Sequence, residues 1–139
     1  MRIFVDSDVI ISSFLSHSGA AYFLLNTSSI QLFISSLSKK ELETVVERLG
    51  IRSDMLTTLI KNNLEVIILS ESLPKIKESL KQYVLDENDA HILAGARAAK
   101  AKFLITYNVK DFKIDKIKKD LSILILTPGN FLQYLRSIQ

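Results

Sequence analysis

Acidic side chains recur along this chain at points where a short apolar run ends or a helix is predicted to begin. They are Asp6, Asp8, Glu41, Asp86, Asp89 and Asp111, and Asn108 stands close to the last of them. Clustered carboxylates repel one another and burial disfavours their charged forms, so such a cluster is costly unless cations occupy it. Hard oxygen ligands suit Mg²⁺ or Mn²⁺, which keep waters for a phosphate substrate. Two such ions, about 3.5–4 Å apart, can activate water and stabilise the leaving oxygen in phosphodiester cleavage.

Each of these motifs also has a purely structural interpretation, and taken alone each motif favours it. Asp86 fits a helix N-cap with Asp89 three residues later, a variant of the capping box. Ser38 and Glu41 fit a capping box as well. The polar residues after the run FLIT could simply form a turn. The constellation as a whole, rather than any one motif, therefore points to chemistry.

Other metal-binding chemistry has little support in the sequence. There is no cysteine, so the chain has no disulfide, no thiolate metal site and no cysteine nucleophile. His17 and His91 stand alone, and an isolated histidine is more often a surface or core residue than a ligand.

The elements that must position the acids can be predicted from the spacing of the apolar residues. The longest informative stretch is 84–112, in which an Ala-rich apolar helix beginning at Ala90 leads into a short apolar strand. The predicted strands are 3–5, 31–35, 66–69, 103–106 and 122–126. The predicted helices are 9–16, 20–26, 36–49, 53–64, 73–83, one from Ala90 and one from Pro128, and a lysine-rich loop precedes the last strand.

Strands that alternate with helices of this length indicate βαβ units and a parallel sheet covered on both faces. The expected fold is α/β, a three-layer α/β/α sandwich around a mostly parallel sheet of about five strands. In such a sheet, sites form outside the carboxyl ends of the strands. The acids should therefore meet at one edge.

Composition is that of an ordinary globular protein. Hydrophobic residues make up 47% of the 139 residues and charged residues 24%, which predicts one domain spanning residues 1–139. The net charge of +3 is weak evidence for a nucleic-acid partner. The N-terminus MRIFVDSD is not expected to act as a signal peptide, because acids follow its few apolar residues, and no apolar run approaches the roughly 18–20 residues that span a bilayer. A soluble cytoplasmic protein with no membrane association is expected.

Four stretches, taken together, resemble the PIN-domain ribonucleases and, among them, the VapC-type toxins of toxin–antitoxin pairs. The stretches are IFVDSDVIISSFL, Glu41-Leu42 followed by Val45-Val46, DENDAHILAGA, and LITYNVKDF. They occur in the family's order and spacing over nearly the whole chain. The most specific of them is the last, where Thr106 and Asn108 precede Asp111-Phe112.

The resemblance implies a metal-dependent endoribonuclease that leaves a 5′-phosphate and a 3′-hydroxyl. It also implies a PIN-like fold, one or two Mg²⁺ or Mn²⁺ ions, an RNA substrate, a cognate antitoxin and a homodimer. Its catalytic metal ligands would be Asp6, Glu41, Asp89 and Asp111. Thr106 and Asn108 would position the acids, and Lys110 and Lys113 are candidates for binding the RNA backbone, as are Lys116, Lys118 and Lys119. A solvated loop and helix face explains these lysines equally well.

The sequence departs from the family pattern at two acids. The family usually has Asn two residues after its first Asp, whereas this chain has Asp8. Asp8 is either an additional metal ligand or a cap for the following helix, and the cap is the favoured interpretation. Asp86 is an extra acid and a candidate secondary ligand. Periodicity does not separate Glu41 from Glu43, so the choice of Glu41 rests on the resemblance.

Three other functional classes share part of this pattern of acids. Asp6-Ser7-Asp8 resembles the Asp-x-Asp of haloacid-dehalogenase-like phosphohydrolases, but the later Gly-Asp motif of that family is absent. A receiver domain would require an acceptor Asp at the end of the third strand, and VIILS has none. A non-catalytic PIN fold that binds RNA or serves in assembly is the remaining alternative, and the intact set of acids argues against it.

Overall fold

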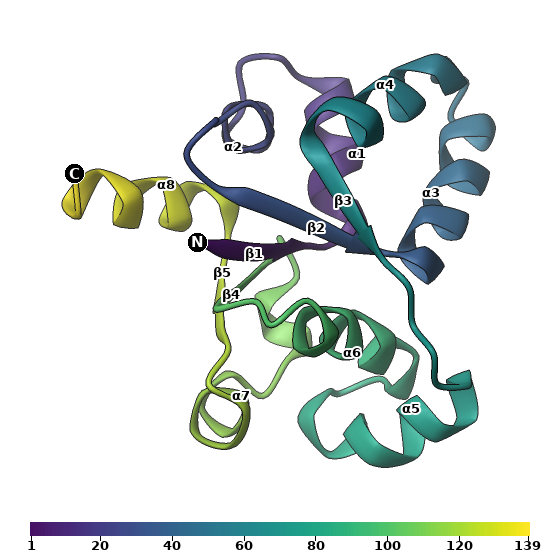
Figure 1. Cartoon of the computed structure of the whole chain (residues 1–139), viewed down its shortest axis with the longest axis vertical. Coiled ribbons are helices and arrows are strands. Elements are labelled where there is room, and N and C mark those ends of the chain that lie inside the picture. The colour runs from purple at the N-terminus through teal and green to yellow at the C-terminus, as the bar shows by residue number, and fades with distance from the viewer.

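The computed structural model describes all 139 residues, which form a sheet between two helical layers (Figure 1). The sheet contains β1 (Arg2–Val5), β2 (Gln31–Ser35), β3 (Leu64–Ile67), β4 (Phe103–Ile105) and β5 (Leu124–Leu126). Its strand order is β3-β2-β1-β4-β5 and every pairing is parallel. The predicted three-layer α/β sandwich is confirmed, and the sheet is wholly rather than mostly parallel.

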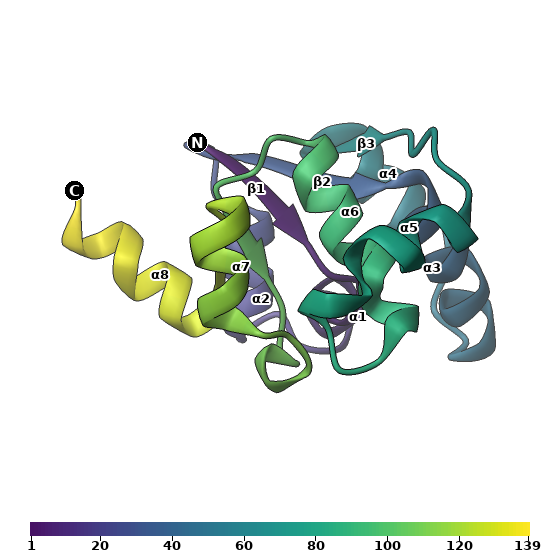
Figure 2. The same cartoon turned by 90° about the horizontal axis from the view of Figure 1, so that it is seen from below.

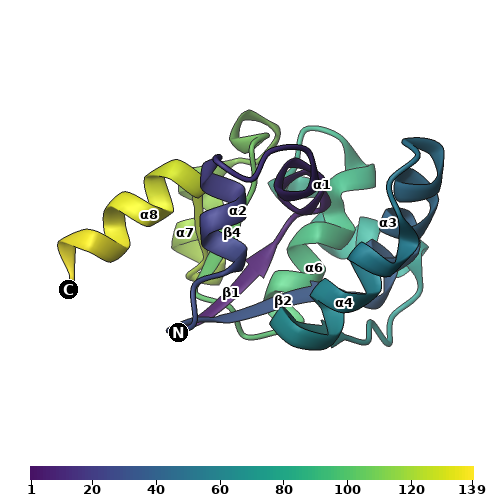
Figure 3. The ribbon, with the colours of Figure 1, turned by 90° about the horizontal axis from the view of Figure 1, so that it is seen from above.

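The two helical layers cover opposite faces of this sheet. One layer contains α1 (Ser7–Leu15), α2 (Ala20–Leu25), α3 (Ser36–Arg48), α4 (Ser53–Asn63) and α8 (Pro128–Ser137), and Figure 3 views the molecule from this side. The other contains α5 (Leu73–Leu80), α6 (Ala90–Ala98) and α7 (Ile114–Leu121), which lie nearest the viewer in Figure 2. Short 3₁₀ turns η1 (Lys81–Tyr83), η2 (Glu87–Asp89) and η3 (Val109–Asp111) lie between these elements.

The inner strands are apolar throughout because both of their faces are buried. Ile3 and Val5 of β1 pack into the core beneath α1–α4, whereas Phe4 packs into the core beneath α5–α7. The same alternation places Leu104 of β4 opposite Phe103 and Ile105. Two separate cores thus hold the central strands in register, and with them the polar residues that follow each strand.

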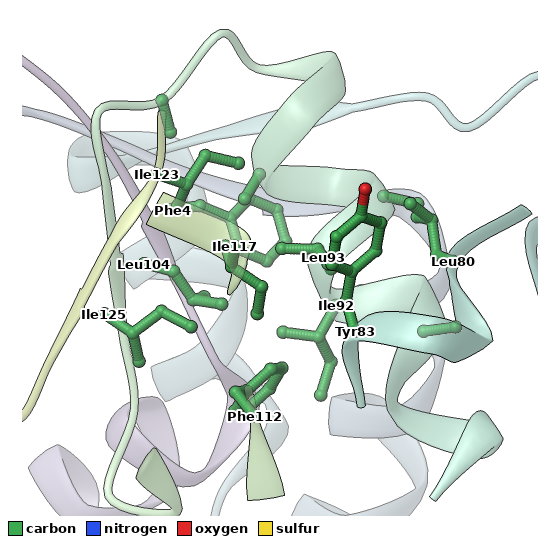
Figure 4. Close-up of a cluster of buried hydrophobic side chains, with 14 of the residues drawn as sticks. Phe4, Leu80, Tyr83, Ile92, Leu93, Leu104, Phe112, Ile117, Ile123 and Ile125 are labelled. Carbon is green, nitrogen blue, oxygen red and sulfur yellow. The ribbon is translucent and has the colours of Figure 1, made fainter. Parts of the chain in front are cut away.

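Close packing between β1 and α6 fixes the position of the central helix. Figure 4 shows Phe4 and Leu93 within the core that also includes Phe112 and Ile117. A Cβ added at Gly95 of α6 would lie less than 3.0 Å from the Phe4 ring. Gly95 therefore lets α6 approach the sheet at this point.

Two predictions of local secondary structure differ from the structure. The third strand is Leu64–Ile67 rather than 66–69, because Leu64 leaves α4 and pairs at once with Leu32. The predicted lysine-rich loop is in fact the helix α7, in which Ile114, Ile117 and Leu121 recur at helical spacing. No helix of the structure has the length and apolar character needed to cross a membrane.

The predicted capping box of Ser38 and Glu41 is also wrong. Ser35 caps α3, since its hydroxyl oxygen accepts from the Ser38 backbone N–H at 3.0 Å. Ser38 is thus already inside the helix, and the proposed capping box with Glu41 does not form. Glu41 is left free for another partner.

Candidate active site

Asp6 lies where β1 ends and α1 begins, and its carboxylate is held on both sides. The Ser7 backbone N–H donates to Oδ1 at 2.7 Å, which makes Asp6 the N-cap of α1. The Thr106 hydroxyl donates to Oδ2 at 2.9 Å. Burial and the neighbouring charge of Asp8 raise the pKa of Asp6 to about 7, although both hydrogen bonds oppose that rise. A carboxylate is held here at a cost in free energy.

Asp8 does not cap α1, contrary to the favoured interpretation. Its Oδ2 accepts from the backbone N–H of Tyr107 and from the side-chain amide of Asn108, each at 3.0 Å. Its Oδ1 is buried without any hydrogen-bond partner. Burial raises the pKa of Asp8, and the charge of Asp111 adds to the rise. Asp8 therefore joins α1 to the segment after β4 and keeps one oxygen unused.

Thr106 and Asn108 form the turn that carries these bonds. Thr106 is fully buried, and its hydroxyl lies 2.9 Å from Asp6 but 3.4 Å from Asp8, so its single hydrogen serves Asp6 better. The same hydroxyl oxygen accepts from the Asn108 backbone N–H at 3.0 Å. Thr106 thus holds Asp6, and Asn108 holds Asp8.

Asp89 and Asp111 are brought together by contacts between the two 3₁₀ turns that carry them. Val84 and Phe112 form an isolated antiparallel bridge, and the Leu85 backbone N–H donates to the Asp111 carbonyl at 3.0 Å. Both acids are half-buried. Burial is the largest cause of the raised pKa of Asp89, and the charge of Asp111 adds to the rise. The two carboxylates are therefore close enough to repel.

Asp86 has the structural role expected of a cap, and Asp89 does not share it. The Asn88 backbone N–H donates to Asp86 Oδ1 at 2.9 Å, so Asp86 caps η2. The Asp89 side chain makes no capping hydrogen bond to α6, and the predicted reciprocal capping box is absent. Asp86 is exposed, and its charge contributes to the raised pKa of Asp89.

Glu41 projects from α3 and meets a residue whose role was not predicted. Its Oε1 lies 3.1 Å from Nε2 of His91, the second residue of α6. Burial lowers the pKa of His91, while the charge of Glu41 opposes that change. His91 was interpreted only as an isolated histidine. The available signal was its position two residues after Asp89, inside an otherwise apolar helix face.

Together, five residues form what we call the acidic cluster: Asp6, Asp8, Glu41, Asp89 and Asp111. The charge of Asp89 raises the pKa of Asp6, and the charge of Glu41 raises that of Asp89. Interactions therefore link all the members from four separate parts of the chain. The remaining candidate ligand, Asp86, interacts only with Asp89 among them.

The cluster fits a divalent cation in its chemistry but does not form a complete metal cage. No three carboxylate or imidazole groups are close enough together to enclose an ion. All the donors of the cluster are nevertheless carboxylate oxygens, which Mg²⁺ and Mn²⁺ prefer. The buried Asp8 Oδ1 lacks a partner, and the pKa values of Asp6, Asp8 and Asp89 are raised by burial. A nearby positive charge would relieve both costs.

The predicted RNA-binding lysines differ in their surroundings. Lys110 in η3 and Lys113 immediately before α7 are exposed beside Asp111. Lys116 instead donates to Gln82 at 3.0 Å and lies over the ring of Tyr83. Lys116 thus has structural partners, whereas Lys110 and Lys113 have none of this kind.

The sequence matches the PIN domain family over residues 2–110. The chain belongs to this family, which confirms the resemblance on which the choice of acids was based. Among curated proteins, none matches the chain.

Solved structures with the same fold are toxin–antitoxin complexes and a toxin. A toxin–antitoxin complex from Klebsiella pneumoniae contains a chain 24% identical to this one, with a TM-score of 0.67, over 91% of this chain and 97% of that one. VapBC2 from Rickettsia felis, bound to a DNA fragment from its promoter, is 20% identical, with a TM-score of 0.63, over 91% and 98%. VapC20 from Mycobacterium tuberculosis, a toxin that cleaves the sarcin–ricin loop, is 15% identical, with a TM-score of 0.54, over 73% and 86%.

Proposed function

We propose that this protein is a metal-dependent endoribonuclease and the toxin of a toxin–antitoxin pair. The observation that carries the proposal is the acidic cluster, in which burial and mutual repulsion raise the pKa values of Asp6, Asp8 and Asp89. Unpaired carboxylates held at such a cost are typical of functional sites. Membership of the PIN domain family supports the same activity.

In this proposal Asp6, Glu41, Asp89 and Asp111 hold one or two Mg²⁺ or Mn²⁺ ions. Divalent ions at such a site supply Lewis acidity for the hydrolysis of an RNA phosphodiester. The expected products carry a 5′-phosphate and a 3′-hydroxyl. Asp8 is an additional ligand through its unpartnered oxygen, and Asp86 is a secondary one.

The other residues bind and orient. The Thr106 hydroxyl holds Asp6, and the Asn108 amide holds Asp8, so both fix the direction in which the carboxylates face. Lys110 and Lys113, exposed beside Asp111, bind phosphates of the RNA backbone and place the strand along the cluster.

The partners proposed are an RNA substrate, a cognate antitoxin and a second copy of the chain, in the cytoplasm. The antitoxin is supported by the similar chains in the Klebsiella toxin–antitoxin complex and in Rickettsia VapBC2. RNA is supported by the similarity to the Mycobacterium toxin, which cleaves the sarcin–ricin loop. That residues 1–139 form a single nuclease domain stays a prediction.

A non-catalytic PIN fold that binds RNA or serves in assembly is the alternative that the experiment must separate. No observation supports the haloacid-dehalogenase-like phosphohydrolase. The distinguishing property is turnover, which requires an intact acidic cluster.

Asp89→Asn should abolish RNA cleavage without unfolding the protein. The Asp89 side chain makes no capping bond, and Asn keeps its shape, so the circular dichroism should match wild type. With Mn²⁺, purified wild type should cleave RNA and the variant should lose nearly all cleavage. In cells, the variant should no longer inhibit growth.

The matched control is Glu87→Gln, which removes one charge from an exposed side chain of the same 3₁₀ turn. This control should retain cleavage. The non-catalytic, RNA-binding alternative is favoured if wild type cleaves no RNA under varied metals and substrates while Asp89→Asn binds RNA as well as wild type does.

A further inference from the structure

The Glu41–His91 pair joins two helices that belong to opposite layers of the molecule. Glu41 lies on α3, which packs in the layer with α1, and His91 lies on α6 in the other layer. Their side chains meet with Nε2 and Oε1 3.1 Å apart. The contact therefore passes over the C-terminal ends of the strands, where the rest of the acidic cluster lies.

The two partners differ sharply in how firmly they are held. The His91 side chain is 8% exposed, and the residues that follow His91 in α6, from Ile92 to Ala96, are all buried, so the imidazole has little freedom. The Glu41 side chain is 50% exposed and hydrogen-bonds to no other residue. A free glutamate at such a position samples several rotamers, and ordering it costs conformational entropy. The fixed imidazole thus determines where the mobile carboxylate points.

The chemistry of the pair leaves one carboxylate oxygen for another ligand. A carboxylate oxygen accepts hydrogen bonds, and an imidazole nitrogen can donate one only when it carries a hydrogen, so Nε2 carries the hydrogen and donates to Oε1. Glu41 Oε2 has no hydrogen-bond partner, and Glu41 lies near enough to Asp89 for its charge to contribute to the raised pKa of Asp89. Hydrogen bonds to the ligating carboxylates are the usual means by which a protein orients them toward a metal.

We propose that His91 is a positioning residue, which orients Glu41 toward Asp89 so that both carboxylates can hold the same divalent ion. The inference rests on the proposed function and adds to it a residue outside the acid motifs. His91 itself binds neither metal nor RNA. Its buried Nδ1 has no partner, which is consistent with a ring whose only polar contact is the one to Glu41.

Two amide substitutions separate positioning from a merely structural contact. In His91→Gln the side-chain N–H₂ reaches the place of Nε2 and still donates to Glu41. In His91→Asn the amide ends near the place of Nδ1 and cannot reach. Calorimetric titration with Mn²⁺ should give near-wild-type affinity for the Gln variant and at least about a tenfold loss for the Asn variant.

Cleavage kinetics provide a second readout on the same proteins. Raising Mn²⁺ should restore kcat of the Asn variant toward wild type, while the KM for RNA stays unchanged throughout. In a Glu41→Gln background, His91→Asn should cause no further loss of Mn²⁺ affinity, because the carboxylate it orients is already gone.

Equal Mn²⁺ affinity in His91→Gln and His91→Asn would overturn the inference, even if both variants had a lower melting temperature. In that case the pair would only connect α3 to α6, and the proposed nuclease would stand. Wild-type protein that binds no Mn²⁺ would instead overturn the metal-dependent function and this inference with it.

Discussion

At the scale of single residues, Asp6 shows how a local structural role and a costly charge combine. The same carboxylate caps α1 and accepts from the Thr106 hydroxyl. Burial and Asp8 nevertheless raise its pKa from 3.8 to about 7. Keeping Asp6 charged costs free energy, which the stability of the surrounding fold offsets. Such shifted pKa values are common at functional sites.

The raised pKa of Asp6 predicts how stability varies with pH in metal-free protein. A carboxyl group with a raised folded-state pKa stabilises the fold below its unfolded value, and that contribution is lost as pH rises through the folded value. For Asp6 the loss spans the interval between 3.8 and about 7. Asp6→Asn should remove this loss. In EDTA, the melting temperature of the variant minus that of wild type should therefore increase from pH 4 to pH 7. Thermal unfolding followed by circular dichroism measures the melting temperature at each pH. A difference between the two proteins that stays constant with pH would contradict the prediction.

At the scale of elements, the position of α6 decides where Asp89 and His91 lie. Figure 4 shows this helix packed against Phe4 and Leu104 of the sheet through Leu93. Gly95 allows the close approach to Phe4, which is fully buried. A shift of α6 away from the sheet would move the start of the helix and the acid just before it.

Gly95→Ala should destabilise the protein although alanine is the better helix former. In an open helix this change would stabilise by about 1 kcal/mol. Here the new Cβ overlaps the Phe4 ring, and overpacking of a core typically costs about 1–3 kcal/mol. Urea unfolding measures the difference in the free energy of unfolding.

Gly129→Ala is the matched control for that substitution. Gly129 lies in the first turn of α8, and nothing is within 4 Å of a Cβ there. The control should be neutral or stabilising. Equal losses of stability at both positions would show that the contact with Phe4 is not the cause.

At the scale of the whole molecule, the acidic cluster exists only because the chain winds its strands in parallel. β1 is flanked by β2 and β4, so the segments that follow these three strands meet at one edge. Asp8 and Asn108, whose side chains are 3.0 Å apart, are 100 residues apart in the chain. Binding of an ion by such a cluster should therefore report on the folded state as a whole.

Mn²⁺ should raise the melting temperature of wild type and leave an Asp6→Asn, Asp89→Asn double variant unchanged. An ion that binds only the folded cluster stabilises it by mass action, by about 2.7 kcal/mol at a concentration of 100 Kd. EDTA should reverse the shift. Equal shifts in the two proteins would mean that these acids are not the ligands.

The sequence by itself determined the architecture and the order of the acids along it. Short apolar runs such as 31–35 and 103–106 predict strands buried on both faces, and the intervening helical periodicities predict the crossovers. These signals are local, so the predicted bounds of the strands lie within two residues of the observed ones. In the lysine-rich α7 the helical signal is weak, because it rests on only three apolar residues, Ile114, Ile117 and Leu121, among lysines.

The tertiary structure alone decided what each member of the acidic cluster contacts across the fold. Whether Asp6 or Asp8 caps α1 depends on the Thr106–Asn108 turn, about 100 residues further along the chain. The partner of Glu41 is a histidine on the opposite layer, and nothing in the spacing of either helix points to it. Helix periodicity places a side chain on a face, but its hydrogen bonds depend on which faces the sheet brings together. The geometry of the candidate site is for that reason a property of the fold and not of any one motif.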